Sequence, residues 1–199
     1  MSPSNSVLEQ IFDAFARHGD AHYGENVSQL DHALQCAQLA KDHGCADTLV
    51  AAALLHDIGR MLDPQGNAIE LMGRDARHED TGALALSRAF SPAVTEPVRL
   101  HVAAKRYLCA VDAAYTAGLS AASLLSLDVQ GGAMLPEEVA AFERERFFED
   151  AVQLRRFDDW GKRIGCPVAD LQSYRPLLER LVAPRVADRS GIVAGHARG

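Results

Sequence analysis

The chain has 199 residues, 48% of them hydrophobic and 24% charged, which is typical of a folded protein with one sizeable core. Acidic residues outnumber basic ones by 27 to 20, so the formal charge of −7 argues against a nucleic-acid partner. The first residues are polar, no stretch is apolar enough to span a bilayer, and the four cysteines show no paired spacing. We therefore expect a cytoplasmic protein with reduced thiols and no membrane contact.

Apolar residues recur at helical spacing along almost the whole chain, and no segment alternates with the period of a strand. The expected helices cover residues 7–18, 27–43, 49–60, 75–90, 91–101, 102–114, 120–130, 144–162 and 170–181, with a further one opening at Pro136. Asp47 is expected to cap the third helix, Gly59 to end it, and a break to fall near His101. The pattern predicts an all-α bundle of one domain, residues 1–183, followed by a loosely ordered tail, residues 184–199.

The central stretch, LVAAALLHDIGR at residues 49–60, places His56 and Asp57 side by side at the end of an apolar helix. Burying an unpaired imidazole and an unpaired carboxylate costs several kcal/mol. A divalent metal removes that cost, because histidine nitrogen and aspartate oxygen are common ligands of zinc, iron and manganese. For an isolated His-Asp dipeptide a hydrogen-bonded pair at a helix end is the better explanation, so the choice depends on the other histidines.

Three further histidines, His32, His78 and His101, occupy successive helical segments and lie next to apolar residues. Metal sites in helical bundles are built from side chains on facing helices, so one histidine per segment favours a metal site. The remaining histidines have simpler explanations at helix ends, in a polar loop and in the tail: His18, His43, His22 and His196.

A late carboxylate completes the ligand set. Asp150, Asp158 and Asp159 are all candidates by spacing, and Asp158 is preferred because it follows Phe157 and shares an apolar stripe with Leu154. Six ligands are too many for one catalytic ion, which favours two metals. The alternative is a mononuclear site that uses a subset of four: His32, His56, Asp57 and Asp158.

The H…HD…D arrangement resembles the pattern of the HD-domain superfamily, most of whose members are metal-dependent phosphohydrolases, and the added His78 and His101 resemble its dinuclear subset. Four stretches narrow the resemblance to the phosphonate-degrading HD oxygenases, which are related to myo-inositol oxygenase. These stretches are GENVSQLDHALQCAQ at 24–38, HVAAKRYL at 101–108, QGG at 130–132 and RRFDDWGK at 155–162. The similarity extends over residues 8–182.

The resemblance implies an HD-domain helical bundle holding two iron ions in the mixed-valent Fe(II)/Fe(III) state. It assigns one iron to the positions that match His32, His56, Asp57 and Asp158, and the other to His78 and His101, with Asp57 bridging. It further implies a (R)-1-hydroxy-2-ammonioethylphosphonate and dioxygen as substrates. Oxygenation at C1 then cleaves the C–P bond and releases phosphate and a carboxylate.

The phosphonate is a dianion, and an acidic protein needs local cations and donors to bind it. Lys105 lies one helical turn after His101, and Arg155 about one turn before Asp158, so both cations are placed to reach the pocket. Surface exposure of both cations is the simpler alternative. The resemblance adds two hydroxyls, a further pocket residue and a guanidinium where relatives carry a second histidine: Ser123, Ser126, Gln130 and Arg60.

The loop before the second helix is expected to recognise the amine of the substrate. Glu25 matches the amine-binding glutamate of the family, while the position of its iron-capping tyrosine is taken by His22, with Tyr23 next to it. Either residue could cap the iron. Tyr23 beside Glu25 makes a partial aromatic cage, so we favour the trimethylammonium substrate, which yields glycine betaine, over the primary amine, which yields glycine.

Two other classes of function compete with the oxygenase. A dinuclear HD phosphohydrolase acting on a phosphate ester would use the same six ligands, with a metal-bridged hydroxide as nucleophile. A metal-stabilised binding module without turnover is the third hypothesis. The Glu25 loop favours the oxygenase, because a phosphohydrolase needs no amine-binding carboxylate. A monomer and a small homo-oligomer are both compatible with the sequence.

Overall fold

The computed structural model describes residues 3–22, 25–63 and 74–182. Its elements follow the chain in this order: α1 (Pro3–His18), α2 (Gln29–Asp42), α3 (Asp47–Leu55), α4 (Ile58–Leu62), α6 (His78–Leu86), α7 (Pro92–Val111), α8 (Ala113–Ala117), α9 (Ala121–Val129), α10 (Pro136–Phe142), α11 (Phe148–Trp160), the 3-10 turn η1 (Leu171–Tyr174) and α12 (Arg175–Leu181). Within these ranges the β pairing amounts to one isolated bridge, between Phe90 and Val182. The all-α prediction is therefore confirmed, while the tail at 184–199 lies outside the described residues and the domain boundary at 183 stays a prediction.

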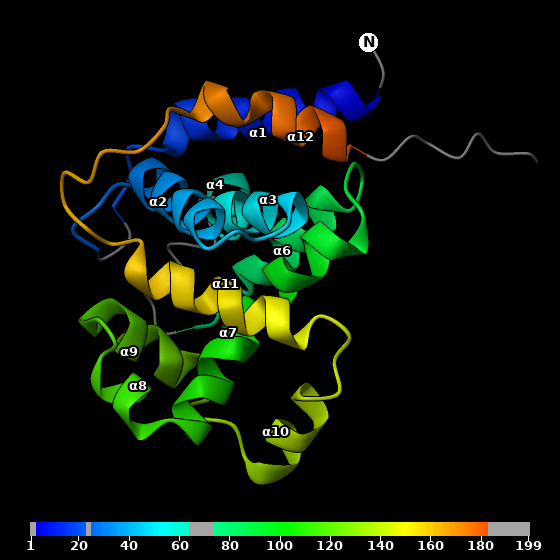
Figure 1. Ribbon diagram of the computed structural model, residues 1–199. Coiled ribbons are helices and arrows are strands. Elements are labelled where there is room, and N and C mark those ends of the chain that lie inside the picture. Colours follow the sequence, from blue (N-terminus) through cyan, green and yellow to red (C-terminus); the bar gives the residue numbers. More distant parts are fainter. Residues whose placement is uncertain (1–2, 23–24, 64–73, 183–199) are drawn as a thin grey trace, which may run out of the picture.

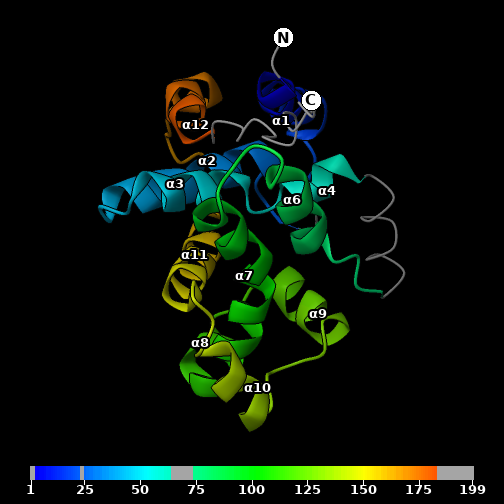
Figure 2. The same cartoon turned by 90° about the vertical axis from the view of Figure 1, so that its right-hand side faces the viewer.

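The helices stack in three tiers (Figures 1 and 2). Helices α1 and α12 lie side by side at one end, where Arg175 forms an ion pair with Glu9 and covers the ring of Phe12. Helices α2, α3, α4 and α6 form the middle tier. Helices α7 and α11 pack beneath it and carry α8, α9 and α10 at the far end.

Helix α3 is the buried centre of the main core. All seven residues from Leu49 to Leu55 are buried, and Ala51, Ala52 and Ala53 have no exposed surface. A helix that is apolar on every side requires partners on every side, and α3 obtains them from α2, α7, α11 and α12. A smaller cluster around Phe142 joins α7, α10 and α11. The apolar run found in the sequence therefore becomes the axis of the bundle.

The expected role of Gly59 as a helix stop is wrong. Helix α3 ends at Leu55, His56 and Asp57 form a turn, and Gly59 lies inside the next helix, α4. A Cβ atom on Gly59 would lie 2.0 Å from the backbone carbonyl oxygen of His78 and 2.8 Å from the backbone nitrogen of Gly82. Glycine is thus required because α4 and α6 approach backbone to backbone, which brings His78 next to the His-Asp pair.

Two further local expectations are corrected. Helix α7 runs without interruption from Pro92 to Val111, so no break occurs near His101. Asp47 is the first residue of α3 and makes no capping hydrogen bond. Its carboxylate instead accepts from Arg180 at 3.0 Å, which ties α3 to α12.

Candidate active site

The first cluster of predicted ligands joins α2, the turn after α3, and α11. The Nε2 atoms of His32 and His56 are 3.2 Å apart. Oδ1 of Asp158 lies 3.3 Å from His32 Nε2 and 3.9 Å from His56 Nε2. Three donor atoms from residues up to 126 positions apart therefore converge in one small volume, with His32, His56 and Asp158 all buried.

The second cluster joins α6, α7 and the same turn. The Nε2 atoms of His78 and His101 are 3.2 Å apart, and Oδ1 of Asp57 lies 3.0 Å and 3.7 Å from them. The other oxygen of Asp57, Oδ2, lies 3.8 Å from His56 Nε2 in the first cluster. Asp57 thus directs one carboxylate oxygen towards each cluster.

These donor spacings fit divalent metal ions. Two ligands that each lie about 2.1 Å from one ion, at angles of about 90–110°, are separated by about 3.0–3.4 Å. The closest contacts within both clusters fall at 3.0–3.3 Å. Two imidazole Nε2 atoms that face each other at 3.2 Å also need a proton or a cation between them. The residues present therefore fit two metals that share the Asp57 carboxylate.

The opposite nitrogen of His32, His56 and His101 is hydrogen-bonded from outside the clusters. The Nδ1–H groups of His32, His56 and His101 donate to backbone carbonyls of Gly161, Ala53 and Val98 at 2.9, 2.9 and 2.7 Å. For His78 the neighbouring group is a carboxylate, with Glu79 Oε2 at 3.6 Å from Nδ1. A donated Nδ1–H leaves the lone pair on Nε2, so these bonds fix the tautomer that a metal ligand requires.

Nearby cations keep both candidate carboxylates ionised. Burial opposes the charge of Asp57, but the Arg60 guanidinium, with Nε 3.3 Å from Oδ1, holds the pKa of Asp57 well below its ordinary value. Burial likewise opposes the charge of Asp158, but Arg155 and then Lys162 hold its pKa well below the ordinary value. Burial, followed by the neighbouring imidazoles, lowers the pKa of His101, which keeps that ring neutral. Ionised carboxylates and a neutral His101 ring are forms that bind metal. At His32, by contrast, burial is outweighed by Cys36 and Asp158, which raise the pKa of the imidazole well above its ordinary value.

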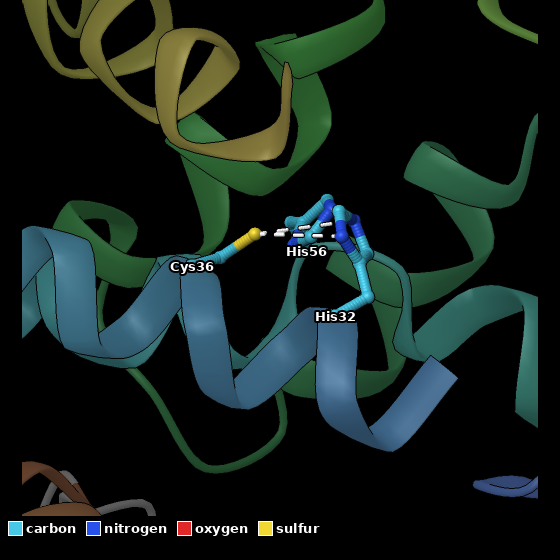
Figure 3. Close-up of side chains that lie close together, drawn as sticks. All are labelled: His32, Cys36 and His56. Atoms are coloured by element: carbon cyan, nitrogen blue, oxygen red, sulfur yellow. Dashed lines mark hydrogen bonds between the residues drawn. The ribbon is translucent and has the colours of Figure 1, made fainter. Parts of the chain in front are cut away.

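Cys36 is a near neighbour of the first cluster that the sequence did not single out (Figure 3). Its sulfur lies 3.8 Å from His32 Nδ1 and 3.9 Å from Nε2, one helical turn along α2. Although Cys36, His32 and His56 lie close enough to share an ion, burial raises the pKa of the thiol. The S–H group points to the carbonyl of Phe157 at 3.4 Å, so Asp158 and Asp57 are better ligands than Cys36.

A cavity of about 520 Å³ opens beside the two clusters and is lined by nearly all the predicted substrate residues. Lys105 is only 2% exposed and donates to Ser126 Oγ at 2.7 Å, which refutes the surface alternative for this lysine. Burial, and next the charge of Arg155, lower the pKa of Lys105 to about 7. Gln130 also lines the cavity, and its Oε1 has no hydrogen-bond partner among the described residues.

Arg155 is buried as well, and it organises this side of the cavity. Its Nη1 donates to Asp158 Oδ2 at 2.6 Å, and its Nη2 contacts both Asp159 Oδ1 and, at 3.5 Å, Ser123 Oγ. Its Nε donates to the Tyr115 hydroxyl at 2.9 Å, and that hydroxyl donates to Asp159 Oδ2 at 2.6 Å. Arg155 therefore supports the candidate ligand Asp158 in addition to facing the cavity.

Glu25 lies in the cavity wall, as the sequence predicted, but in contact with a cation of the protein itself. Its Oε1 accepts from Lys162 Nζ at 2.9 Å and from Ser120 Oγ at 2.8 Å. His22 is exposed and also lines the cavity. Tyr23 lies outside the described residues, so the question whether His22 or Tyr23 caps a metal stays open.

Sequence reasoning missed three polar residues of this site: Lys162, Tyr115 and Gln29. Lys162 follows Asp158 by four residues, the same helical spacing that identified Lys105 after His101, so the signal was present. Gln29 lies one turn before His32 in α2, so the same spacing could have identified it. Tyr115 offered no such signal, because it reaches Arg155 from another helix.

An all-α bundle with a His-Asp pair at its centre defines an HD-domain protein, and the HD domain family matches residues 30–120. Hydroxymethylphosphonate dioxygenase of Gimesia maris is 47% identical over 173 residues, which cover 86% of both chains. The glycine-betaine-forming [1-hydroxy-2-(trimethylamino)ethyl]phosphonate dioxygenase of Leisingera caerulea is 39% identical over 178 residues, covering 89% of this chain and 91% of the relative. The chain belongs to the HD-domain family and, within it, to the branch of dioxygenases that these relatives represent.

In the part of the chain that the structure describes, no helix is both long enough and apolar enough to cross a membrane.

Proposed function

We propose that the protein uses dioxygen to cleave the C–P bond of a 1-hydroxyphosphonate, releasing phosphate and a carboxylate. In the balanced reaction, R–CH(OH)–PO3H2 and O2 give R–COOH and H3PO4. The carbon and phosphorus centres supply all four electrons that reduce O2, so no external reductant is needed. The observation that carries the proposal is the juxtaposition of two metal-type clusters with Lys105, Arg155 and two serine hydroxyls around one cavity.

The candidate metal ligands are the six residues that the sequence predicted: His32, His56, Asp57, His78, His101 and Asp158. The paired donor spacing and the position of Asp57 between the clusters support two ions rather than one. The metal we propose is iron in the mixed-valent state. Iron supplies the redox chemistry that dioxygen requires, which amino-acid side chains do not provide.

The protein's own groups would bind and orient the phosphonate. Protonated Lys105 and the Ser126 hydroxyl face one part of the cavity, and Arg155 with Ser123 faces the adjoining part. A phosphonate dianion favours the protonated form of Lys105 and accepts charge-assisted hydrogen bonds from the guanidinium. Arg60 and Gln130 add a further cation and an amide to the same lining. These contacts would place C1 next to the two clusters.

Three substrates fit this proposal, and they differ in the substituent on C1. The trimethylammonium form, giving glycine betaine, is the one that the sequence favoured, and the primary amine gives glycine. Hydroxymethylphosphonate, the substrate that names the Gimesia maris relative, has hydrogen in that place and gives formate. All three share the phosphonate and the C1 hydroxyl, so the proposed reaction does not depend on the choice.

The experiment uses protein loaded with Fe(II) without oxygen and then mixed with each phosphonate. Admission of oxygen should start phosphate release with one O2 consumed per phosphate. The main competitor, a phosphohydrolase, predicts anaerobic phosphate release from ordinary phosphate esters, and a binding module predicts no release from either class of compound. Asp57→Asn is the matched variant, because it retains the size of the side chain and removes the bridging charge.

A further inference from the structure

Glu25, Lys162 and Gln29 line the cavity but make none of the phosphonate contacts described above. Lys162 extends from just after α11, while Glu25 precedes α2 by four residues, and their charged groups meet at 2.9 Å. The two side chains are only 16% and 19% exposed. At this depth their charges are poorly screened by water, so the pair neutralises the carboxylate that was expected to bind an amine.

Lys162 is held in place by more than Glu25. Its Nζ donates to Ser123 Oγ at 3.1 Å and lies 3.7 Å from Asp158 Oδ1. The second acceptor position of Glu25 Oε1 is used by the Ser120 hydroxyl. A substrate ammonium that approached Glu25 would therefore have to displace Lys162 from three oxygen contacts or lie beside its positive charge.

The net charge of the cavity lining also disfavours a positively charged substituent on the substrate. Among the described lining residues, three carboxylates face four lysine and arginine cations. Two metal ions would make the balance more positive still. This lining suits a phosphonate dianion, but it repels a second positive charge carried by the substrate.

The remaining lining is polar or aliphatic. A quaternary ammonium is best recognised by aromatic faces, and none of the described lining residues is Phe, Tyr or Trp. Gln29, which is 4% exposed, contributes a neutral amide whose Oε1 has no hydrogen-bond partner among the described residues. Such an amide can accept from a hydroxyl or a water molecule beside a small substituent.

We propose that Lys162 determines substrate specificity by neutralising Glu25, so that this chain selects 1-hydroxyphosphonates whose C1 substituent is uncharged. The substituent is hydrogen, as in hydroxymethylphosphonate, or a small group bearing a hydroxyl that Gln29 can bind. This inference rests on the proposed C–P cleavage and opposes the trimethylammonium substrate that the sequence alone favoured.

The kinetic test compares kcat/KM for hydroxymethylphosphonate with kcat/KM for the two ammonium substrates on the same protein preparation. The ratio cancels any shared loss of iron or of folded protein. The native chain should favour the uncharged substrate at least tenfold. Lys162→Gln should shift the ratio at least tenfold towards the ammonium substrates, because it frees Glu25. The double variant with Glu25→Gln should lose that shift.

A binding measurement keeps this inference separate from the proposed reaction. Calorimetry on zinc-loaded protein compares 2-aminoethylphosphonate with ethylphosphonate, a pair that differs in the ammonium group. The native chain should bind ethylphosphonate at least tenfold more tightly, and Lys162→Gln should erase the difference. This binding measurement tests the effect of Lys162 on specificity even if no phosphonate is cleaved.

The native chain provides the decisive outcome if Lys162→Gln fails to fold. Glu25→Gln leaves the Lys162 charge without its partner, so the preference for ethylphosphonate should be kept or increased in that variant. A native preference for either ammonium substrate, or stronger binding of 2-aminoethylphosphonate than of ethylphosphonate, would overturn the role of Lys162. The proposed C–P cleavage would survive that result if oxygen-dependent phosphate release persists.

Discussion

Replacing Lys105 with methionine should stabilise the metal-free protein, by an amount that falls as the pH rises above 7. Lys105 is 2% exposed, and its pKa falls from 10.5 to about 7 because burial and the charge of Arg155 disfavour the ammonium. Between these two pKa values the unfolded chain binds more protons than the folded chain, so the contribution of Lys105 becomes less unfavourable as the pH rises. The cost is about 4 kcal/mol at pH 7, about 2 kcal/mol at pH 9 and below about 0.5 kcal/mol at pH 10.5.

The assay is urea unfolding of metal-free native protein and Lys105→Met at pH 7, 8 and 9. The pH-independent part of the difference includes the better packing of methionine and the lost bond to Ser126. The change of this stability difference with pH isolates the contribution of the Lys105 ammonium. It should be about 2 kcal/mol between pH 7 and pH 9. Lys41→Met controls for the loss of one charge: it removes an exposed ammonium that lies over the Tyr174 ring, and its effect on stability should stay constant between pH 7 and pH 9. A Lys105→Met difference that stays constant with pH would refute the reasoning, and with it the poised lysine in the phosphonate site.

Three further predictions concern the ligands, the backbone and the cation network. Asp57→Asn should leave less than half of the iron bound after gel filtration, because both clusters share this carboxylate. Gly59→Ala should lower the free energy of unfolding by about 3 kcal/mol or more in urea titrations, because its Cβ meets the His78 carbonyl. Tyr115→Phe should raise the KM for phosphonate about tenfold, with a smaller change in kcat, because Arg155 loses an acceptor.

Matched controls make these outcomes interpretable. Gly118→Ala places its Cβ at an ordinary 3.5 Å from the nearest atom and should change stability by less than about 1 kcal/mol. Tyr107→Phe removes a hydroxyl that bonds to Glu143 on the surface and should leave KM unchanged. Full iron content in Asp57→Asn would contradict the bridging assignment. If Tyr115→Phe and Tyr107→Phe changed KM and kcat by the same factors, the role given to the Tyr115 network would be contradicted.

His32 and His101 could be found from the sequence because each is a polar residue on the apolar face of a helix. Both side chains are buried, and an uncompensated imidazole there would be costly. The same logic placed Lys105 and Arg155, since each lies within one helical turn of a candidate ligand. Local spacing therefore predicted which side chains face inward, and the structure shows that they converge on one cavity.

What spacing could not predict were the partners across the bundle. Glu25 and Lys162 are separated by 137 positions, so no helical periodicity connects them, and Glu25 by itself resembled a free amine receptor. Gly59 was taken for a stop signal, because the 2.0 Å approach to the His78 carbonyl exists only once α4 and α6 are packed. In both cases a tertiary contact that the sequence did not indicate bears on the role of the residue.

In the proposed function, two cations of the cavity would contact both the metal ligands and the phosphonate. Arg60 pairs with Asp57 and Arg155 pairs with Asp158, and both guanidinium groups also line the cavity. Without metal, each guanidinium is drawn to its carboxylate. Metal binding would compete for the carboxylate charge and make the guanidinium more available to an anion. By reciprocity a bound phosphonate should then raise metal affinity as much as metal raises phosphonate affinity. Loss of either arginine should therefore weaken phosphonate binding and reduce this coupling between metal and phosphonate, which separates these residues from cations that serve the substrate alone.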